Sequence, residues 1–470
     1  MSDVLGALRR AVGNGAVLTG ADAAPWSQDW TGAYHWTPLC VVRPASTAEV
    51  SAVMKVAFDA RMPVVPVSGN TGLAGGTFAE GAIMLSLDRM NRVREIRPEA
   101  RIAVVEAGVI LANLHEAALA KGLVFPLTFG ARGSSMVGGF LSTNAGGSNV
   151  LRYGNTRDLV LGIEVVMADG QVMNLMSELH KDNSGLNLKH LMVGAEGTLG
   201  VITQAVLKLV PRPAATATAM VAVASLDDAL SLLNALQMAT GGAVEAFEYM
   251  PQAYLEVYAR HNPQSRPPFD TEHAHCIMVE IAATAPRDAT PGPYGEVPLV
   301  GYLEEVLGDM LESGRVLDAV VAQNEAQRAE IWERREAAGS LLVSRNPMVN
   351  NDIAVPLDKV SVFLDRMNLR LAVLDPQAEL MLVSHLGDGN VHYTVWPGNP
   401  DPVHCDAIME AVEEEALALG GSFSAEHGIG VTKRPSMARR KDKVAVSAMK
   451  AIKAALDPRG ILNPGKVFPD

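Results

Sequence analysis

Cysteine, positive charge and long apolar runs are all scarce in this sequence of 470 residues. Cys40, Cys276 and Cys405 are odd in number and far apart, which indicates a reducing compartment and argues against a disulfide framework or a zinc finger. The formal net charge of −13 argues against nucleic-acid binding, which rewards clustered Lys and Arg. No apolar stretch approaches the roughly 18 residues of a membrane span, and residues 1–10 lack the plan of a signal peptide. We therefore expect a soluble cytoplasmic protein, not an integral membrane protein.

The first part of the chain alternates strands and helices, which is an α/β pattern. Ser46 and Glu49 form a capping-box pair in front of a helix that ends near residue 60. Residues 1–35 are weakly patterned, and we expect them at the surface. The other elements expected here are strands at 38–44, 83–87, 101–107 and 201–210, a helix at 111–121, and a hairpin of 163–167 and 171–175 around Asp169-Gly170.

A composition change follows the prolines at Pro211 and Pro213, which mark the best candidate for a domain boundary. Beyond it, strands at 218–224, 243–249, 275–283 and 315–321 alternate with helices at 226–239, 298–312 and 324–343. This pattern predicts a second domain in which helices cover a sheet. A further helix is expected at 436–456.

The loop from Pro66 to Gly76 brings four glycines together after a short buried strand. Glycine lets the main chain approach a ligand closely, and successive backbone N–H groups form an anion-binding concavity. A phosphate or pyrophosphate is therefore one interpretation, and a tight turn that needs its glycines is the other. The loop lacks both the Gly-Lys-Ser/Thr ending of a P-loop and the Gly-x-Gly-x-x-Gly spacing of a Rossmann site.

Two more glycine clusters follow, at 128–158 and at 194–200. The first combines glycines with Ser, Thr and Asn over a long stretch without hydrophobic filling, and such an ordered loop is usually functional. A flexible linker is the structural alternative, although Leu141, Leu151 and Tyr153 would anchor the segment. These clusters favour a ligand site.

His385 and His392 bracket a Gly-Asp-Gly turn that can bring both imidazoles toward one point. Glu426 adds a carboxylate from another segment, and two His with one carboxylate suit Zn²⁺ or a similar divalent ion with a position open for substrate. His427 stands beside that carboxylate as a candidate proton acceptor. A lone His is more often a hydrogen-bonded structural residue, but this combination favours a site.

The three glycine clusters, the two-His turn, Glu-His-Gly and a Leu-Asn-Pro-Gly-Lys tail follow one another in this order. Together they resemble the FAD-linked oxidoreductases of the vanillyl-alcohol oxidase (PCMH-type) superfamily over nearly the whole chain. Within it the chain is most similar to D-2-hydroxyglutarate dehydrogenases, with D-lactate dehydrogenases and glycolate oxidase flavoprotein subunits near by. The most specific motifs are Asn144-Ala-Gly-Gly, Leu151-Arg-Tyr-Gly, Lys181-Asp-Asn-Ser-Gly, Gly194-Ala-Glu-Gly-Thr-Leu-Gly and Ser424-Ala-Glu-His-Gly.

The resemblance implies an α+β fold in three parts. Residues 1–212 would form a PCMH-type FAD-binding domain of two subdomains. Residues 213–420 would form an α/β cap domain for the substrate, with an antiparallel sheet covered by helices and most of the metal site. Residues 421–470 would return as a helical segment to the FAD domain and complete both sites.

The resemblance also implies which residues hold FAD. The first glycine loop has no His or Cys for a covalent bond to flavin, so non-covalent FAD is expected. The implied cofactor residues are Pro66, Val67, Ser68, Gly69, Asn70, Thr71, Gly72, Gly75, Gly130, Gly133, Ser134, Gly138, Gly139, Thr143, Asn144, Gly146, Gly147, Tyr153, Gly154, Glu196, Gly200, Val201, Ile202 and Asn463.

The implied reaction is oxidation of a D-2-hydroxy acid to the 2-oxo acid by hydride transfer from C2 to flavin N5. The metal at His385, His392 and Glu426 would polarise the C2 hydroxyl, and His427 would take its proton as general base. Arg335, Asn390 and His427 would bind the substrate, Arg335 with two parallel hydrogen bonds to a carboxylate. A helix-surface ion pair of Arg335 with a nearby Glu is the open alternative.

Two positions depart from the pattern of hydroxyglutarate enzymes, which have a Lys where Asn350 stands and a Thr where Gly339 stands. D-2-hydroxyglutarate or a similar acid is the expected substrate, and D-lactate or a glycolate-type acid is the alternative. Electrons would leave through an acceptor protein or a soluble carrier, since no iron–sulfur Cys spacing is present. A homodimer is a further expectation that the sequence leaves open.

Two other classes remain in view. A metal-dependent hydrolase could use His385, His392, Glu426 and a water, but it leaves the glycine clusters unexplained. A flavin-carrying electron-transfer subunit with an idle active site is the second.

Overall fold

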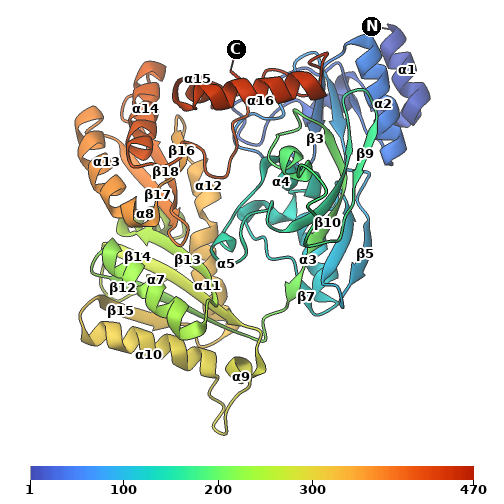
Figure 1. Ribbon diagram of the computed structural model, residues 1–470. Helices are drawn as coiled ribbons and strands as arrows, with labels where there is room; N and C mark the ends of the chain where they lie inside the picture. The colour runs from blue at the N-terminus through green and yellow to red at the C-terminus, as the bar shows by residue number, and fades with distance from the viewer. Residues whose placement is uncertain (1, 470) are drawn as a thin grey trace.

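Two lobes make up the computed structural model, which describes residues 2–469 (Figure 1). The blue-to-green half of the chain folds around two sheets, and the green-to-orange half folds around one large sheet. Of the last two helices, drawn in red, α15 lies beside α14 of the second lobe and α16 returns to the first lobe. This is the α+β architecture that the resemblance implied.

The first lobe contains a four-stranded sheet in the order β1-β2-β4-β3, in which β2, β4 and β3 run parallel. Beside it lies an antiparallel five-stranded sheet in the order β5-β6-β10-β8-β9, and β7 pairs with β11. The strands are β1 Val17–Leu18, β2 Cys40–Val42, β3 Val64–Val67, β4 Ile83–Ser86, β5 Val93–Arg97, β6 Ile102–Glu106, β7 Leu123–Val124, β8 Val160–Val166, β9 Val172–Leu175, β10 Val201–Lys208 and β11 Val210–Pro211.

Short helices join these strands. The expected capping box is confirmed, because Ser46 Oγ accepts from Glu49 N at 3.3 Å and the Glu49 carboxylate accepts from Ala45 N. Gly122 follows α3 with a positive φ of 70°. The helices of this lobe are α1 Ser2–Val12, α2 Thr47–Ala60, α3 Leu111–Leu119, α4 Val137–Thr143, α5 Val150–Tyr153 and α6 Lys189–Met192.

The expectation that the N-terminal residues are weakly patterned and superficial was wrong for α1. Leu8 is fully buried, and Val4, Leu5 and Val12 pack against the same core on one helix face. This spacing of i, i+1, i+4 and i+8 is a helical period that the sequence interpretation overlooked.

The second lobe is a seven-stranded sheet in the order β15-β12-β14-β13-β17-β18-β16, and every neighbouring pair is antiparallel. One face packs on α7, α10, α13 and α14, and the other packs on α8, α11 and α12. The strands are β12 Ala215–Val223, β13 Val244–Pro251, β14 His275–Ala283, β15 Val316–Val321, β16 Val349–Ala354, β17 Glu379–His385 and β18 Asn390–Trp396.

The helices expected at 226–239 and 298–312 are present as α7 and α10, whereas α8, α9, α13 and α14 were not predicted. The helix expected at 324–343 is two helices that meet at Ala337. The helices are α7 Leu226–Thr240, α8 Gln252–His261, α9 Pro286–Ala289, α10 Pro298–Glu312, α11 Glu325–Glu336, α12 Ala338–Leu342, α13 Val360–Leu374 and α14 Pro402–Ala418.

The tail crosses back to the first lobe. The helix expected at 436–456 is α15 Arg434–Arg440 and α16 Lys443–Leu456, separated because Asp442 begins a new helix by accepting from Ala445 N at 2.8 Å. Beyond α16, Val64 N donates to Ile461 O and Asn463 N donates to Val64 O, each at 2.8 Å. The segment after α16 therefore extends the first sheet beside β3.

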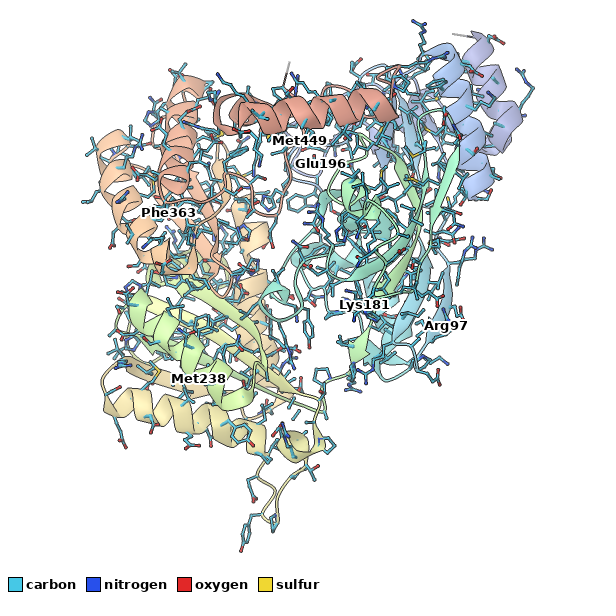
Figure 2. The ribbon with its side chains drawn as sticks, viewed as in Figure 1. Arg97, Lys181, Glu196, Met238, Phe363 and Met449 are labelled. Atoms are coloured by element: carbon cyan, nitrogen blue, oxygen red, sulfur yellow. The ribbon has the colours of Figure 1, made fainter. Side chains whose placement is uncertain are left out.

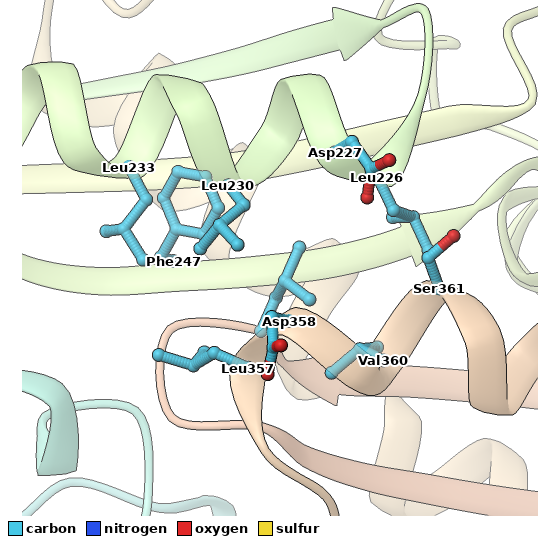
Figure 3. Close-up of a pocket in the computed structure, with 10 residues that line it drawn as sticks. Leu226, Asp227, Leu230, Leu233, Phe247, Leu357, Asp358, Val360 and Ser361 are labelled. Carbon is cyan, nitrogen blue, oxygen red and sulfur yellow. The ribbon is translucent and has the colours of Figure 1, made fainter.

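Neither a membrane-spanning helix nor the seam beside α7 adds a functional site to the described residues. Among the helices of residues 2–469, none is long and apolar enough to cross a membrane. A seam between α7 and the start of α13, lined by Leu233, Phe247, Leu357 and their neighbours, is shown in Figure 3. Its volume of about 10 Å³ accommodates at most one water molecule.

Candidate functional site

A single cavity of about 680 Å³ joins the glycine loops of the first lobe to the inner face of the cap sheet. Residues 68–72 border it on one side, and His385, His392 and His427 border it on the other. Glu196, labelled in Figure 2 beneath α16, also lines it. The cavity thus brings together segments that are more than 300 residues apart in sequence.

The first glycine loop is held in shape by its own side chains. Asn70, at a positive φ of 52°, donates through Nδ2 to Gln28 O and accepts from Thr77 Oγ1. A Cβ at Gly69 would overlap the carbonyl oxygen of Ser134, so this glycine allows two loops to touch. A Cβ at Gly72 would meet no atom within 4 Å. The backbone at Gly72 is therefore open to the cavity for a ligand.

Most of the residues expected to hold FAD line this cavity. They are Pro66, Ser68, Gly69, Asn70, Thr71, Gly72, Gly130, Ser134, Gly138, Gly139, Thr143, Gly146, Glu196, Gly200, Val201, Ile202 and Asn463. The structure does not place Val67, Gly75, Gly133, Asn144, Gly147, Tyr153 or Gly154 on its wall.

Several of these seven have structural contacts instead. Tyr153 donates its hydroxyl to Glu245 at 2.6 Å, which ties α5 to β13 of the cap. Asn144 ends α4 with a φ of 51° and accepts from Arg157 N at 2.8 Å. Gly147 permits a close approach to the Thr128 carbonyl. They shape the loops that border the cavity.

The donors and acceptors of the wall fit a flavin nucleotide. Open backbone at the first loop and helix α4 suit a pyrophosphate. Asn463 donates to Gly76 O and Glu196 O, whereas its buried Oδ1 has no partner among residues 2–469. A buried acceptor without a donor is costly unless a ligand satisfies it.

The three expected metal ligands lie together. His385 ends β17 and His392 lies on β18, so the hairpin turn brings their rings to a centroid distance of 5.2 Å. Glu426 Oε2 is 3.8 Å from Nε2 of each ring. Burial raises the pKa of Glu426 to about 7, although the His385 charge opposes this.

Asp352 on β16 belongs to the same cluster, and the sequence analysis missed its role. It is fully buried and accepts from the backbone N–H groups of Glu426 and His427, each at 2.8 Å. Burial alone would raise its pKa, but the charges of His427 and Lys433 outweigh this and hold the pKa well below its usual range. One ligand atom each from Asp352, His392, Glu426 and His427 falls within a mutual distance of 4.8 Å. Asp352 is the one charged residue between Val349 and Val355, and this was the available signal.

His427 stacks beside His392, with ring centroids 5.6 Å apart and an interplanar angle of 16°. Its Nδ1 lies 3.7 Å from Asp352 Oδ2. Burial lowers the pKa of His427 below its usual value, so a neutral imidazole is favoured. A neutral imidazole can accept a proton.

Arg335 is largely buried at the end of α11, and its Nε donates to Glu248 Oε2 at 2.7 Å. Glu248 Oε1 lies 2.8 Å from His385 Nδ1. Burial lowers the pKa of His385, but the carboxylates of Glu248 and Glu426 outweigh this and raise it to about 9. Arg335 thus lines the cavity in an ion pair with a buried Glu. Glu248 was not identified from the sequence.

Asn390 lies off the cavity wall, whereas Asn350 and Gly339, the two positions that depart from the hydroxyglutarate pattern, lie on it. Asn390 Nδ2 donates to Asp352 Oδ1 and Ile353 O, which places this amide behind the cluster and off the cavity wall. Asn350 and Gly339 both line the cavity. Asn350 Oδ1 accepts from Thr394 Oγ1 at 3.1 Å.

Comparison with known proteins agrees with this geometry. Residues 38–176 match the family described as FAD binding domain, and residues 212–467 match the family described as FAD linked oxidases, C-terminal domain. p-Cresol methylhydroxylase with substrate bound has the same fold, with a TM-score of 0.77 and 17% identity over 100% of this chain and 97% of that one. Alkyldihydroxyacetonephosphate synthase also has this fold, with a TM-score of 0.72 and 16% sequence identity over 99% of this chain and 84% of that chain.

The protein is therefore an FAD-dependent oxidoreductase. Its curated relatives include D-2-hydroxyglutarate dehydrogenase of Xanthomonas citri pv. viticola, 34% identical over 95% of this chain and 93% of that protein. The enzyme of the same name from Stutzerimonas stutzeri is 34% identical over 98% of both chains. The mitochondrial enzyme of Bos taurus is 33% identical over 99% of this chain and 84% of that protein. This chain belongs to the family of FAD-linked oxidases that contains these dehydrogenases.

Proposed function

We propose that this protein oxidises a D-2-hydroxy acid to the corresponding 2-oxo acid with bound FAD and a divalent metal ion. The observation that carries the proposal is the shared cavity. Glycine loops suited to a flavin nucleotide and a His/Glu cluster suited to a metal face the same space of about 680 Å³. Metal-assisted oxidation of an alcohol beside a carboxylate by a flavin would use both groups at one place.

Each absent group would supply one kind of chemistry. FAD, when bound, would accept the hydride from substrate C2 at N5. Zn²⁺ or a similar ion held by His385, His392 and Glu426 would polarise the C2 hydroxyl as a Lewis acid. Asp352 is a further candidate ligand in this cluster.

His427 would then remove the proton from the C2 hydroxyl at a ring nitrogen. Asp352 fixes the backbone on either side of the Glu426–His427 peptide, so the two side chains keep one relative position. Burial keeps the imidazole neutral and ready to accept. In this proposal His427 is the proton acceptor and Asp352 holds its backbone in place.

Arg335 would bind the α-carboxylate. Its Nε is occupied by Glu248, and its Nη2 faces His385 at 3.4 Å. The remaining donors can meet one carboxylate in the cavity. The role of Asn390 as a direct substrate ligand stays a prediction, because both hydrogen bonds of its amide go to β16.

Two compounds are the first candidates for the substrate. D-2-hydroxyglutarate is the acid in the names of the relatives, and D-lactate is the alternative left by Asn350 and Gly339 at the cavity wall. The electron acceptor, a homodimer, non-covalent attachment of FAD, the boundaries at 212 and 420, and a cytoplasmic location stay predictions. The named relatives include mitochondrial proteins.

The decisive test is an anaerobic titration of the purified yellow protein with a panel of D- and L-2-hydroxy acids. Bleaching of flavin absorbance by D-isomers, with formation of the 2-oxo acid, is expected. A flavin that no 2-hydroxy acid reduces would overturn the proposal. A colourless protein that hydrolyses esters or amides after zinc loading would favour the hydrolase.

A further inference from the structure

Three neighbouring strands of the cap sheet present side chains to the cavity in rows. Asp352 on β16, His392 on β18 and Val383 on β17 are paired across the strands and form the row that contains the metal cluster. Two residues further along, the paired residues are Asn350, Thr394 and Met381. Alternate residues of a strand share a face, so this second row lies about 6.6 Å from the first.

No member of the second row carries a charge. Thr394 and Met381 are buried, and Thr394 donates its hydroxyl to Asn350 Oδ1. The one hydrogen bond of the Asn350 side chain within residues 2–469 is the one that its Oδ1 accepts, so its Nδ2 is a neutral donor on the cavity wall. Helix α12 also contributes Gly339, Ser340 and Leu342 to the wall. A substrate side chain that extends from the metal cluster along this row meets Thr394, Met381 and the Asn350 amide, none of which is charged.

The arginine side chain on the cavity wall already forms an ion pair. Arg335 is the single Lys or Arg on the wall among residues 2–469, and its guanidinium is paired with the buried Glu248. Glu336, also on the wall, forms an ion pair with Arg132, so the Arg132 guanidinium is likewise paired. The proposed metal ion and the partly neutralised guanidinium are enough to bind one carboxylate and its α-hydroxyl. They leave no further cation on the described wall for a second carboxylate.

We propose that the site takes D-2-hydroxy monocarboxylic acids with an uncharged side chain and discriminates against a second, distal carboxylate. Asn350, Thr394 and Met381 are the specificity-determining row. This inference rests on the proposed function and narrows its substrate class. A distal carboxylate that leaves water for this row finds no cation, and a buried charge without a partner is strongly disfavoured. Transfer of a neutral group of the same size from water to this row costs much less free energy.

Four D-acids test this with the FAD- and metal-loaded enzyme and an artificial electron acceptor. They are D-2-hydroxyglutarate, its 5-amide, D-2-hydroxypentanoate and D-2-hydroxy-4-methylpentanoate. The 5-amide has the size of D-2-hydroxyglutarate without its second charge. We expect kcat/KM for the amide and the aliphatic acids to exceed that for D-2-hydroxyglutarate about 100-fold. A D-2-hydroxyglutarate value equal to or above the others would overturn the inference.

Binding of the 2-oxo acids, measured by titration calorimetry, gives a readout that needs no turnover. Tighter binding of 2-oxo-4-methylpentanoate than of 2-oxoglutarate is expected, and the reverse order would contradict the inference. A failure of the proposed function is recognised separately, since there the flavin stays oxidised with every acid whatever the order of binding.

Variants at the second row test its assignment. Asn350→Lys places a cation beside Thr394 and should raise kcat/KM for D-2-hydroxyglutarate about tenfold while lowering it for D-2-hydroxypentanoate. Asn350→Met, similar in length but uncharged, should not raise the D-2-hydroxyglutarate value. Val373→Lys on the exposed face of α13 adds the same charge far from the cavity and should leave the ratio unchanged. An equal effect of Asn350→Lys and Asn350→Met would overturn the assignment, and the wild-type ratio decides the inference if Asn350→Lys does not fold.

Discussion

The Glu196 carboxylate of the first lobe accepts the backbone N–H of Ile429 at 2.7 Å, in the segment that follows the proposed base. Its second oxygen accepts from Gly430 N at 2.8 Å. Glu196 itself lies at a positive φ of 50°, and its carbonyl oxygen accepts from Asn463 Nδ2 at 2.7 Å. One side chain therefore ties the third glycine cluster to the loop that carries Glu426 and His427.

Replacing Glu196 with Gln should loosen that loop. The amide offers one acceptor and places an N–H group against a backbone donor, which leaves a buried donor unsatisfied. We expect a loss of about 2 kcal/mol in the free energy of unfolding, measured by urea titration, and a lower kcat with flavin still bound. Glu178→Gln, which removes an exposed ion pair with Arg97, is the matched control and should change little. A Glu196→Gln variant with the wild-type free energy of unfolding would show that these hydrogen bonds do not hold the loop.

The base assignment predicts a large kinetic effect of His427→Ala. Removal of a general base lowers rates about 10²–10⁴-fold, while FAD absorbance and metal content should stay normal. Added imidazole should restore part of the rate. His404→Ala, which removes a ring bound to Asp375 outside the cavity, is the control and should keep full activity. A His427→Ala enzyme with the wild-type rate would remove the assignment.

Chelation tests the proposed metal. Dialysis against EDTA should abolish flavin reduction without releasing flavin, and Zn²⁺ or a similar ion should restore it. His392→Ala should bind less metal by elemental analysis, because it removes one of the proposed ligands. An EDTA-treated enzyme that is free of metal and fully active would show that the cluster works without an ion.

Glu106 predicts an acid-sensitive contribution to stability. Burial raises the pKa of this carboxyl, but hydrogen bonds from Arg92 and Arg94 outweigh it and lower the pKa below 4.5. Because the folded-state pKa lies below the unfolded one, the stabilisation is complete above about pH 4.5 and is lost as the pH falls through the folded-state value. Glu106→Gln should cost about 1–2 kcal/mol at pH 7, with the difference from wild type shrinking below pH 4. A difference that is constant with pH would contradict this.

The cysteines should differ in reactivity toward a thiol reagent at pH 8. Burial raises the pKa of Cys40 to about 11 and that of Cys276 to about 12, and both are fully covered. Cys405 is partly exposed. The thiolate is the reactive species, so we expect native labelling of Cys405 and labelling of all three in urea. Rapid native labelling of Cys40 or Cys276, located by mass spectrometry, would contradict the packing.

Local patterns were enough for much of the fold. The capping box at Ser46, the break after the strand at 201–210 and the cap helices α7 and α10 depend on neighbours within a few residues, and these signals can be read directly from the chain. The cap helices α8, α13 and α14 were not predicted. The division of the tail into α15 and α16 had a local signal in Asp442 that the periodicity of the surrounding residues obscured.

The order of the glycine loops and the His–Glu pair can be read along the chain, and this order indicates the family and its FAD chemistry. Which residues line the same cavity depends on the fold. Asp352 and Glu248 gain their roles because strand pairing and burial place carboxylates beside His427, His385 and Arg335. A carboxylate's partners in a sheet are set by register between strands far apart in sequence, so spacing along one chain cannot reveal them.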